Sequence, residues 1–452
     1  MEFDGKRVLV VGMARSGVAA AELLLNCGAI PLINDAKAME AFGDELQGLM
    51  DTKAEFHLGE DPLALLEKAD AVIISPGVPI DAPLVKAARE KGIPLIGELE
   101  LGALFDQSRM VAITGTNGKT TTVTLLCEIF KNAGKISRTA GNIGIPYSRV
   151  AMEAKEDDIT VCEVSSFQLE TVETFHPKVA AILNITEDHL NRHGTMAEYI
   201  RLKMRIFENQ TEEDVAVLNF DDALLKDKAD GIKSRVMWFS RESAVPLGAF
   251  VEDGCIMCAF DGEIRKVVET DQVRIPGPHN LENALAATCV ATAMGVPAPV
   301  IRHTLRTFEG VEHRIEFVRT LEGITFINDS KGTNVDSTIK AVQTMKDQTI
   351  IILGGYDKKT DFAPLAAEIA KTPFIRGAVV IGQTAEAIKG ALKEKGFHNV
   401  KSAESLEHGI SLARESLGGS GNVLLSPACA SFDMFKDYEE RGRVFKEIVL
   451  KL

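Results

Sequence analysis

A glycine-rich stretch, VAITGTNGKTTTVTL, carries the residue types that bind a nucleotide phosphate. Its first half has the pattern of a buried strand, and its second half has apolar residues at helical spacing. The turn between them would present backbone N–H groups and the positive end of a helix to one place. Gly115 and Gly118 allow the backbone to approach phosphate closely, and Lys119 would reach the β- and γ-phosphates. The Thr120 hydroxyl would bind Mg²⁺. An ordinary strand-to-helix turn is the alternative interpretation.

Two further polar residues follow predicted strands. Glu163 ends the run ITVCE, and His189 follows VAAILNI within TEDHLNRH. Ligands of open parallel sheets bind at the carboxyl ends of the strands, so both side chains would lie near the phosphate loop. A carboxylate and an imidazole suit a divalent cation that serves a phosphate. Taken singly, Glu163 would be a solvated strand end and His189 a loop histidine, but their recurrence at successive strand ends favours the cation site.

Strand and helix patterns alternate along the chain. Short apolar runs such as KRVLVVG, AVIIS, MVAITG, TIIILGG and NVLLS alternate with segments rich in Ala, Leu, Lys and Glu, for example residues 17–26 and 120–132. This order predicts an α/β protein with parallel sheets covered by helices. Boundaries near Gly97 and Gly310 divide the chain into residues 1–97, 98–309 and 310–452, each of ordinary domain size.

The composition restricts the classes of partner. The chain has 452 residues, of which 45% are hydrophobic, and a formal net charge of −15. That charge argues against general binding to nucleic acid or to a membrane surface. No apolar run is long enough to cross a membrane, and the first residues lack a signal-peptide pattern. The seven cysteines show no secreted spacing, which favours a cytoplasmic protein, and the lone C-x-x-C of Cys255 and Cys258 lacks a second metal-binding pair.

Four motifs together resemble one enzyme family. TGTNGKTT, EVSSFQLE, NITEDHLNRH and PGPHNLENALAA are similar to segments of the Mur ligases, the amide ligases of peptidoglycan precursor synthesis, and folylpolyglutamate synthetases share parts of the pattern. The common phosphate loop G-x-x-x-x-G-K-[ST] would need glycine at position 113, where this chain has Ile113. The shorter spacing is the rule in the resembled family. The resemblance implies three α/β domains: an N-terminal Rossmann-like domain for a UDP-substrate, a central ATP-binding domain of the P-loop ATPase type, and a C-terminal Rossmann-like domain for an amino acid.

Motifs near both ends narrow the resemblance. FINDSKGTNVDST and LLSPACASFDMFKDYEERG resemble the branch of the family that adds D-glutamate, and VVGMARSG and SPGVP agree with it, so the resemblance covers essentially the whole chain. It implies an ATP-dependent ligase that adds D-glutamate to UDP-N-acetylmuramoyl-L-alanine through an acyl phosphate. The implied cofactor is Mg²⁺, and the implied state is a monomer without nucleic-acid or membrane partners. The nearest alternatives are a sister ligase for another amino acid and a folylpolyglutamate synthetase, and a non-catalytic nucleotide-driven binding module is a further one.

The resemblance also implies roles for individual residues. It assigns catalysis to Lys119, Glu163, His189 and a carbamylated Lys203. It assigns metal binding to Thr120, Glu163, His189 and Lys203. By residue type alone, Lys203 in YIRLKMRIF would be a surface lysine of a basic helix. His279 belongs to the same implied ATP segment as Asn280. The residues implied in ATP binding are Gly115, Thr116, Asn117, Gly118, Lys119, Thr120, Thr121, Asn280, Asn283, Arg314 and Asp329.

The first domain allows two interpretations. GMARSG follows a strand, and Asp35 ends the next strand as a ribose-binding acid would, which permits a nicotinamide-dependent oxidoreductase. However, Ala14 stands where the dinucleotide pattern has glycine. The resemblance instead assigns this domain to the UDP-substrate. The residues it implies in that role are Arg15, Ser16, Asp35, Ser75, Pro76, Gly77, Asn142, Gln168 and His189.

The amino-acid site is implied in the third domain. The residues assigned to D-glutamate are Lys331, Thr333, Lys358, Ser431 and Tyr438. Lysine and hydroxyl groups suit its two carboxylates. Lys359 is the alternative to Lys358, because GGYDKKTD can be aligned one residue apart. Tyr438 stands where some relatives have phenylalanine, which keeps the ring and adds a hydroxyl.

Overall fold

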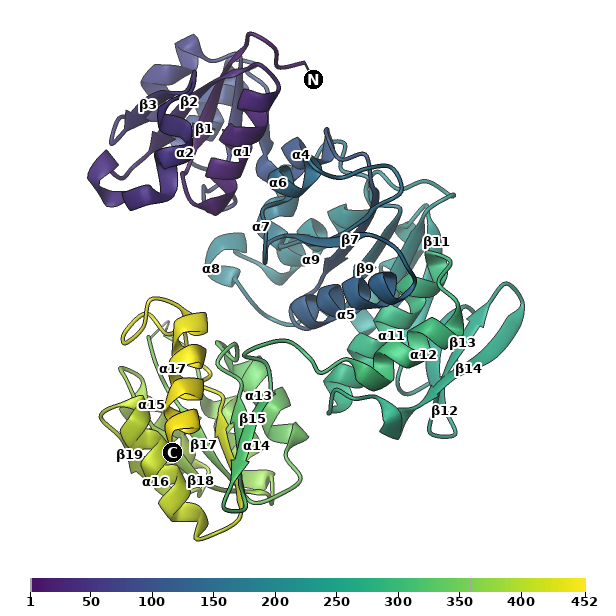
Figure 1. The fold of residues 1–452 in the computed structure, drawn as a ribbon, viewed down its shortest axis with the longest axis vertical. Coiled ribbons are helices and arrows are strands. Elements are labelled where there is room, and N and C mark those ends of the chain that lie inside the picture. The colour runs from purple at the N-terminus through teal and green to yellow at the C-terminus, as the bar shows by residue number, and fades with distance from the viewer. Residues whose placement is uncertain (1, 358) are drawn as a thin grey trace. The chain divides into compact units, whose positions relative to one another are not determined.

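Three separate sheets organise the chain in the computed structural model, which describes residues 2–357 and 359–452 (Figure 1). The chain packs as two compact units. The first unit consists of Met1–Val273 and Glu282–Phe308, and it contains two of the sheets. The second consists of Arg274–Leu281 and Glu309–Leu452, and it contains the third.

The N-terminal sheet has the strand order β3-β2-β1-β4-β5, and all neighbouring strands are parallel. The strands are β1 (Arg7–Val11), β2 (Ile30–Asp35), β3 (Glu55–Leu58), β4 (Ala71–Ile74) and β5 (Leu95–Gly97). The helices are α1 (Arg15–Asn26), α2 (Gln47–Met50), α3 (Pro83–Glu90) and α4 (Glu98–Ala103), with the short 3₁₀ segments Met39–Ala41, Gly43–Leu46 and Pro62–Lys68. The direction of strand succession reverses between β1 and β4, which is where open α/β sheets bind ligands.

Each central strand of this sheet is covered on both faces. Along β1, Val8 and Val10 belong to one core cluster, whereas Leu9 and Val11 belong to another. Successive side chains of a strand point to opposite faces, so a continuous apolar run is stable only where helices cover both. The sequence pattern therefore requires the layered α/β arrangement.

The central sheet has nine strands in the order β14-β13-β12-β11-β10-β9-β6-β8-β7. The strands are β6 (Arg109–Thr114), β7 (Ser137–Gly141), β8 (Ile159–Glu163), β9 (Val179–Ile182), β10 (Val215–Asn219), β11 (Arg235–Ser240), β12 (Gly248–Glu252), β13 (Cys255–Phe260) and β14 (Glu263–Glu269). Its α-helices are α5 (Lys119–Asn132), α6 (Tyr147–Ala151), α7 (Ser166–Leu169), α8 (Leu190–His193), α9 (Met196–Met204), α10 (Ala223–Lys226), α11 (Pro278–Ala293) and α12 (Ala298–Thr307). Its 3₁₀ segments are Arg205–Phe207, Ala229–Gly231 and Thr270–Gln272. All neighbouring pairs among β6 to β12 are parallel, whereas the pairs β12–β13 and β13–β14 are antiparallel.

The C-terminal sheet has the order β15-β16-β20-β17-β18-β19. The strands are β15 (Glu316–Leu321), β16 (Ile324–Asn328), β17 (Thr349–Leu353), β18 (Ile375–Val380), β19 (Val400–Ser402) and β20 (Gly421–Leu425). The helices are α13 (Val335–Thr344), α14 (Ala363–Lys371), α15 (Ala385–Glu394), α16 (Leu406–Leu417) and α17 (Tyr438–Lys451). Only the β15–β16 pair is antiparallel among the described pairings of this sheet.

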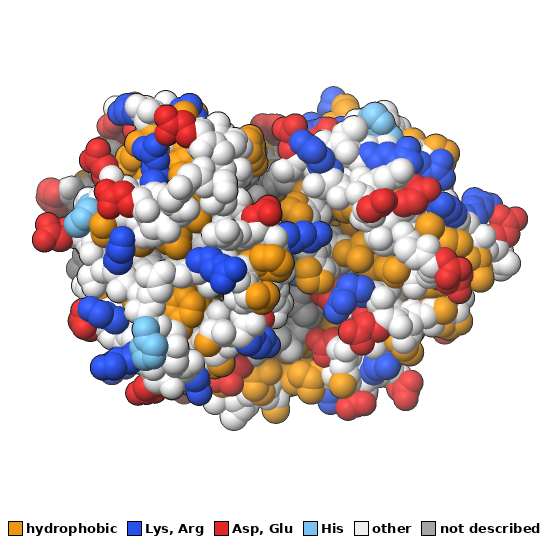
Figure 2. Space-filling model, turned by 90° about the horizontal axis from the view of Figure 1, so that it is seen from below, with side chains coloured by type: hydrophobic (Ala, Val, Ile, Leu, Met, Phe, Trp, Pro, Cys, Tyr) orange, Lys and Arg blue, Asp and Glu red, His pale blue; other side chains and the backbone are white. Residues whose placement is uncertain are grey.

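The expectation of parallel sheets covered by helices is confirmed for most strands, but it is incomplete at two sheet edges. The hairpin strands β13 and β14 extend the central sheet antiparallel to β12, and β15 does the same beside β16. These strands lack the long buried runs of the parallel ones, because antiparallel strands can leave one face to solvent, whereas the parallel strands are covered on both faces. Within the described residues, no helix is both long and apolar enough to span a membrane. On the face drawn in Figure 2, acidic and basic side chains are interspersed.

Candidate active site

The predicted phosphate loop has a backbone that only glycine suits at two positions. Gly118 (φ 88°) precedes the first residue of α5, and a Cβ there would lie 2.3 Å from the Asn283 Oδ1 atom. Gly115 (φ 148°) faces Leu183, whose Cβ would be 3.1 Å from an added Cβ. Both angles lie in the region that residues with a side chain avoid. The loop thus opens the N-terminus of a 14-residue helix, which favours bound anions.

The segment NITEDH fixes this loop from the neighbouring strand end. The Asn117 backbone N–H donates to Asn184 Oδ1 at 2.9 Å, and the Asn184 amide donates back to the Asn117 carbonyl at 3.1 Å. Thr116 Oγ1 donates to the Thr186 carbonyl at 3.0 Å. Thr121, one turn into the helix, has a buried hydroxyl with no hydrogen-bond partner in the described residues. The loop is therefore held in shape by protein groups before any ligand binds.

Lys119 and Thr120 turn to different sides of the loop. The Lys119 ammonium donates to the carbonyls of Gly115 and Thr116, both at 2.8 Å, and so lies over the loop. The Thr120 hydroxyl donates to the Glu163 carboxylate at 2.9 Å. Glu163 ends β8 and Thr120 lies beyond the end of the adjacent strand β6, which explains why they meet.

A chain of hydrogen bonds continues from Glu163 to the end of β7. The second Glu163 oxygen accepts from the Asn142 side-chain amide at 3.0 Å. Glu163 is 2% exposed, so a buried carboxylate stands between a hydroxyl and an amide. Burying a carboxylate is unfavourable unless a cation or several donors compensate it, and hard oxygen ligands suit Mg²⁺. Thr120, Glu163 and Asn142, all predicted site residues, are thus brought together.

Lys203 is buried, so its interpretation as a surface lysine is wrong. It is 1% exposed, whereas Arg201, two residues earlier on α9, has 59% of its side chain exposed. Its ammonium donates to the Gly115 carbonyl at 2.9 Å and lies 3.4 Å from Thr114 Oγ1. Burial, and then the charge of Lys119, hold the pKa of Lys203 well below its ordinary value. A lowered pKa increases the share of neutral amine, which is the form that reacts with CO₂.

Tyr199, which was not among the predicted residues, supports Lys203. The Tyr199 ring lies 4.7 Å from the Lys203 ammonium and 5.4 Å from the ring of His193, and its hydroxyl is 3.2 Å from Thr116 Oγ1. Tyr199 precedes Lys203 by four residues, the spacing that places two side chains on one helix face. This spacing is the feature of the sequence that could have identified Tyr199 as a neighbour of Lys203. Burial raises the pKa of Tyr199, so the phenol remains neutral.

His189 lies at the entrance to this region. It caps the start of α8 with a left-handed backbone (φ 55°), and 47% of its side chain is exposed. Its ring packs edge-on against Phe167 at 4.8 Å, and Nε2 is 3.5 Å from Asp188. Phe167 directly precedes Gln168, which is a predicted substrate residue. His189 is therefore positioned beside the substrate segment rather than deep in the phosphate loop.

Eight of the nine residues predicted to bind the UDP-substrate line one cavity of about 380 Å³. They are Arg15, Ser16, Asp35, Ser75, Pro76, Gly77, Asn142 and Gln168. The cavity lies at the β1–β4 reversal, where the Ser75 hydroxyl donates to the Gly12 carbonyl at 2.5 Å. Asp35 accepts backbone N–H groups of Met13 and Lys37, and so it shapes the loop after β1. Asn142, which lines this cavity, also donates to Glu163, the carboxylate that accepts from Thr120 of the phosphate loop.

Of the remaining predicted ATP residues, Asn280, Arg314 and Asp329 belong to the second unit, whereas Asn283 belongs to the first. Arg314 has a buried Nε atom, and His279 a buried Nδ1 atom, without a hydrogen-bond partner in the described residues. Burial, with the charges of Arg314 and Lys340, lowers the pKa of His279 to about 3, so its ring is neutral. Asn280 donates to the Pro276 carbonyl at 2.7 Å. In the first unit, the Asn283 side chain accepts from Thr122 Oγ1 at 3.3 Å and lies against the phosphate loop. The unpartnered buried nitrogens fit contacts to a nucleotide.

Asp329 is a buried acid in this unit. Its carboxylate accepts from Ser426 Oγ at 2.6 Å and from the Ile315 N–H at 3.2 Å. Burial is the largest influence and raises the pKa of Asp329 from 3.8 to about 6. The folded state then holds a proton that the unfolded state releases between about pH 4 and pH 6. The charged carboxylate therefore destabilises the fold increasingly as the pH rises through this range.

Replacing Asp329 by Asn should remove this pH-dependent cost. We expect the free energy of unfolding of Asp329→Asn, relative to the unaltered protein, to rise by about 1–3 kcal/mol between pH 5 and pH 8, since one pKa unit corresponds to about 1.4 kcal/mol. Urea unfolding at both pH values measures it. Asp347→Asn, at an exposed position of the same unit, is the control. An identical pH dependence for both variants would contradict the assignment.

Among the predicted D-glutamate residues, Lys331 and Thr333 follow β16, Ser431 follows β20, and Tyr438 begins α17. The Lys331 ammonium lies 5.4 Å from the centre of the Tyr438 ring, and Thr333 follows Lys331 by two residues. Arg441, which sequence analysis missed, is fully buried and donates to the Ser330 carbonyl at 2.8 Å and to the Cys429 carbonyl at 3.1 Å. It thereby fixes the loop before Lys331 to the loop before Ser431, which is buried. Lys358 lies outside the described residues, and the alternative, Lys359, has a backbone N–H that donates to Asp357 at 2.7 Å.

Comparison with known proteins decides the family. Three domain-family models match the chain: the Mur ligase MurD-like N-terminal domain over residues 6–97, the Mur ligase middle domain over 113–291, and the Mur ligase glutamate ligase domain over 313–429. The chain is 46% identical to a UDP-N-acetylmuramoylalanine–D-glutamate ligase of Thermoanaerobacter sp. (strain X514), and the alignment covers 100% of each chain. It is 44% identical to the protein of that name from Alkaliphilus oremlandii, also over 100% of both.

The chain belongs to the Mur ligase family. Solved structures agree on the fold. UDP-N-acetylmuramate-alanine ligase MurC from Thermotoga maritima gives a TM-score of 0.62 at 20% identity, over 99% of both chains. MurF ligase from the same organism, described in complex with ADP, gives 0.59 at 19% identity, over 99% of this chain and 96% of its own. For this Mur ligase, the expected α/β fold with a Rossmann-like N-terminal domain, a central domain and a Rossmann-like C-terminal domain is confirmed.

Proposed function

We propose that this Mur ligase joins the alanyl carboxylate of UDP-N-acetylmuramoyl-L-alanine to the amine of D-glutamate, with ATP cleaved to ADP and phosphate. Full-length relatives at 44–46% identity carry the corresponding name, which supports the choice of substrates. The reaction makes a peptidoglycan precursor. Because it consumes ATP, we place it in the cytoplasm. By family resemblance, we propose that the enzyme is a monomer.

One observation carries this proposal: the hydrogen-bonded chain from Thr120 through Glu163 to Asn142. Thr120 belongs to the phosphate loop, and Asn142 lines the cavity of the predicted UDP-substrate. The loop end and the substrate cavity therefore meet at one buried carboxylate. A γ-phosphate on the loop and a substrate carboxylate beyond Asn142 would face each other there, as the transfer of a phosphoryl group to a carboxylate requires.

The residues of the phosphate loop stabilise the negative charge of the phosphoryl group during its transfer. Carboxylate oxygen attacks the γ-phosphorus, the bond to the β-phosphate oxygen breaks, and ADP leaves, giving an acyl phosphate. Lys119 and the N–H groups at the start of α5 stabilise the negative charge that develops on the transferring group. Thr120, Glu163 and a carbamylated Lys203, with His189 at the entrance, would hold Mg²⁺, which supplies further charge neutralisation when bound. Glu163 and Lys203 fit this role because both are buried around the same loop.

The second half of the reaction needs the second unit. The D-glutamate amine attacks the acyl carbon, and phosphate leaves from the tetrahedral intermediate. Lys331, Thr333, Ser431 and Tyr438, with Lys358 or Lys359, hold the two carboxylates of the amino acid. Arg441 acts only through the two loops that it joins, so we class it as a positioning residue. Arg314 and Asp329 contact the nucleotide.

The direct test is a measurement of phosphate release with substrates omitted one at a time. We expect release only when ATP, UDP-N-acetylmuramoyl-L-alanine and D-glutamate are all present, because the amine completes the turnover. L-glutamate, glycine and L-lysine are matched controls for a sister ligase, and a folate substrate tests a folylpolyglutamate synthetase. Equal rates with another amino acid would refute the D-glutamate assignment. Fluorescence titration with NADH tests the oxidoreductase alternative, for which tight binding would be required.

A further inference from the structure

Residues 312–316 form a strained segment that carries Arg314. His313 (φ 65°) and Ile315 (φ 45°) both have left-handed backbones. This conformation is uncommon for residues with a side chain and is least favourable for β-branched ones such as isoleucine. Such a segment persists only where its surroundings hold it in place, and it is often found where a functional side chain must be aimed.

Backbone hydrogen bonds tie this segment to the loop after β16. The His313 N–H donates to Glu316 Oε2 at 2.9 Å, and the Ile315 N–H donates to Asp329 Oδ1 at 3.2 Å. The Lys331 N–H donates to the His313 carbonyl at 3.0 Å. The segment that aims Arg314 is therefore joined to the loop that carries Asp329, proposed for the nucleotide, and Lys331, proposed for D-glutamate.

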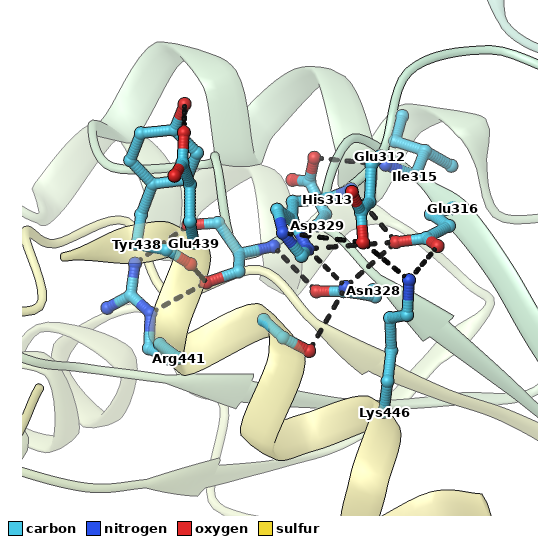
Figure 3. Close-up of polar contacts among 12 residues, drawn as sticks. Glu312, His313, Ile315, Glu316, Asn328, Asp329, Tyr438, Glu439, Arg441 and Lys446 are labelled. Atoms are coloured by element: carbon cyan, nitrogen blue, oxygen red, sulfur yellow. Dashed lines mark hydrogen bonds and ion pairs between the residues drawn. The ribbon is translucent and has the colours of Figure 1, made fainter.

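A buried side chain at the end of β16 adds a second layer of contacts (Figure 3). The Asn328 amide nitrogen lies 2.9 Å from His313 Nδ1 and 2.9 Å from Glu316 Oε2, and its third contact is the Gly442 carbonyl of α17 at 3.4 Å. Asn328 is fully buried, and His313 is 4% exposed. The strained segment is thus connected through Asn328 to the last helix.

One face of α17 completes the arrangement. Tyr438, Gly442 and Lys446 are four residues apart, so they lie along the same side of the helix. A Cβ on Gly442 would lie 2.3 Å from His313 Nδ1, so only glycine leaves room for that ring. The Tyr438 ring lies 6.4 Å from the His313 ring, nearly perpendicular to it. The same helix face therefore contacts the proposed D-glutamate site and the segment of Arg314.

Lys446 supplies the charge that this cluster requires. Its ammonium lies 2.7 Å from Glu312 Oε1 and 2.7 Å from Glu316 Oε1. Figure 3 shows Lys446 reaching both carboxylates from α17. The ligating atoms of Glu312, His313 and Glu316 lie within 4.8 Å of one another, a spacing that would suit a metal ion. Here an ammonium from α17 stands between the two carboxylates and bridges both ends of the segment.

We propose that Lys446 and Gly442 are positioning residues: this face of α17 holds residues 312–316 in their strained conformation, and so aims Arg314 at the nucleotide in a fixed relation to Tyr438 and Lys331. The inference rests on the proposed role of Arg314 in binding ATP. The C-terminal helix thereby holds Arg314 at a fixed position relative to the proposed D-glutamate residues of the second unit.

The test compares Lys446→Met with Lys446→Arg. We expect Lys446→Met to raise KM for ATP roughly tenfold, the size of effect expected when a charge-assisted contact is lost. KM for UDP-N-acetylmuramoyl-L-alanine should stay unchanged, because its predicted residues lie in the first unit. Lys446→Arg should restore most of the ATP affinity, and Gly442→Ala should repeat the defect by displacing His313. Lys451→Met, on an exposed lysine of the same helix, is the matched control.

Two further measurements separate this inference from the proposed function. In an Arg314→Ala background, Lys446→Met should cause no additional rise in KM for ATP, since both act through Arg314. Hydrogen exchange of the His313 and Ile315 amides in the ligand-free protein should quicken in Lys446→Met but not in Lys451→Met. Unchanged exchange at these amides would overturn the positioning role. A different pair of results is possible: Arg314→Ala leaves KM for ATP unaltered, and exchange still quickens in Lys446→Met. This pair would refute the role of Arg314 in the proposed function, but it would support the restraint of residues 312–316 by α17.

Discussion

Replacing Lys119 by Ala should lower kcat by about 10³-fold or more, the scale expected when one preorganised group that stabilises transition-state charge is removed. The Lys119 ammonium is held over the loop by the carbonyls of Gly115 and Thr116, each at 2.8 Å. It therefore stands at the N-terminus of α5, where the proposed γ-phosphate transfers. Phosphate release under saturating substrates measures the effect.

The fold should survive this change, because the Lys119 side chain contacts backbone carbonyls and fills no core position. Lys131→Ala is the matched control: it removes a lysine with 57% of its side chain exposed from the last turn of the same helix. We expect its kcat to stay within about twofold, as for most exposed substitutions. A Lys119→Ala enzyme with normal turnover would refute the proposed ligase mechanism, and would leave the chain as a nucleotide-binding module.

Replacing Lys203 by Ala should lower kcat by at least about 10²-fold, because the proposed carbamate orients the cation at the transferring phosphate. The buried amine and its lowered pKa favour the reaction with CO₂, in which the amine nitrogen bonds to carbon and one proton is released. Short carboxylates such as formate or acetate should partly restore Lys203→Ala, since they can place an anionic oxygen in the space that the side chain leaves. Arg201→Ala, on the exposed face of α9, should keep full activity.

A direct observation accompanies this kinetic test. Carbon-13 NMR of the unaltered protein in labelled bicarbonate should give a carbamate signal that is absent from Lys203→Ala. If the variant is inactive, gains nothing from added carboxylate and shows no difference in the NMR spectrum, then Lys203 acts as an amine. In that case, its contact with the Gly115 carbonyl would be its contribution.

The sequence by itself determined the α/β class, most strands of the three sheets and the glycine-containing turn between β6 and α5, because these follow from local patterns. A buried parallel strand must be a continuous apolar run, and a loop that receives phosphate needs glycine where φ is positive, as at Gly115 and Gly118. Motif resemblance then placed the substrate residues around Asn142 and Gln168, which line one cavity with the turn at Ser75. Their exact roles stay predictions that the proposed experiments address.

Only the tertiary structure decided which residues support this site from a distance. Whether Lys203 was exposed or buried depended on which face of α9 packs on the phosphate loop, and its residue type gives no indication of that. Tyr199, Arg441 and Lys446 have ordinary surroundings in the sequence, yet each contacts a segment at least 80 residues away. Contacts between such distant segments arise when sheets and helices pack together, because only packing brings residues of different strands and helices within hydrogen-bonding distance.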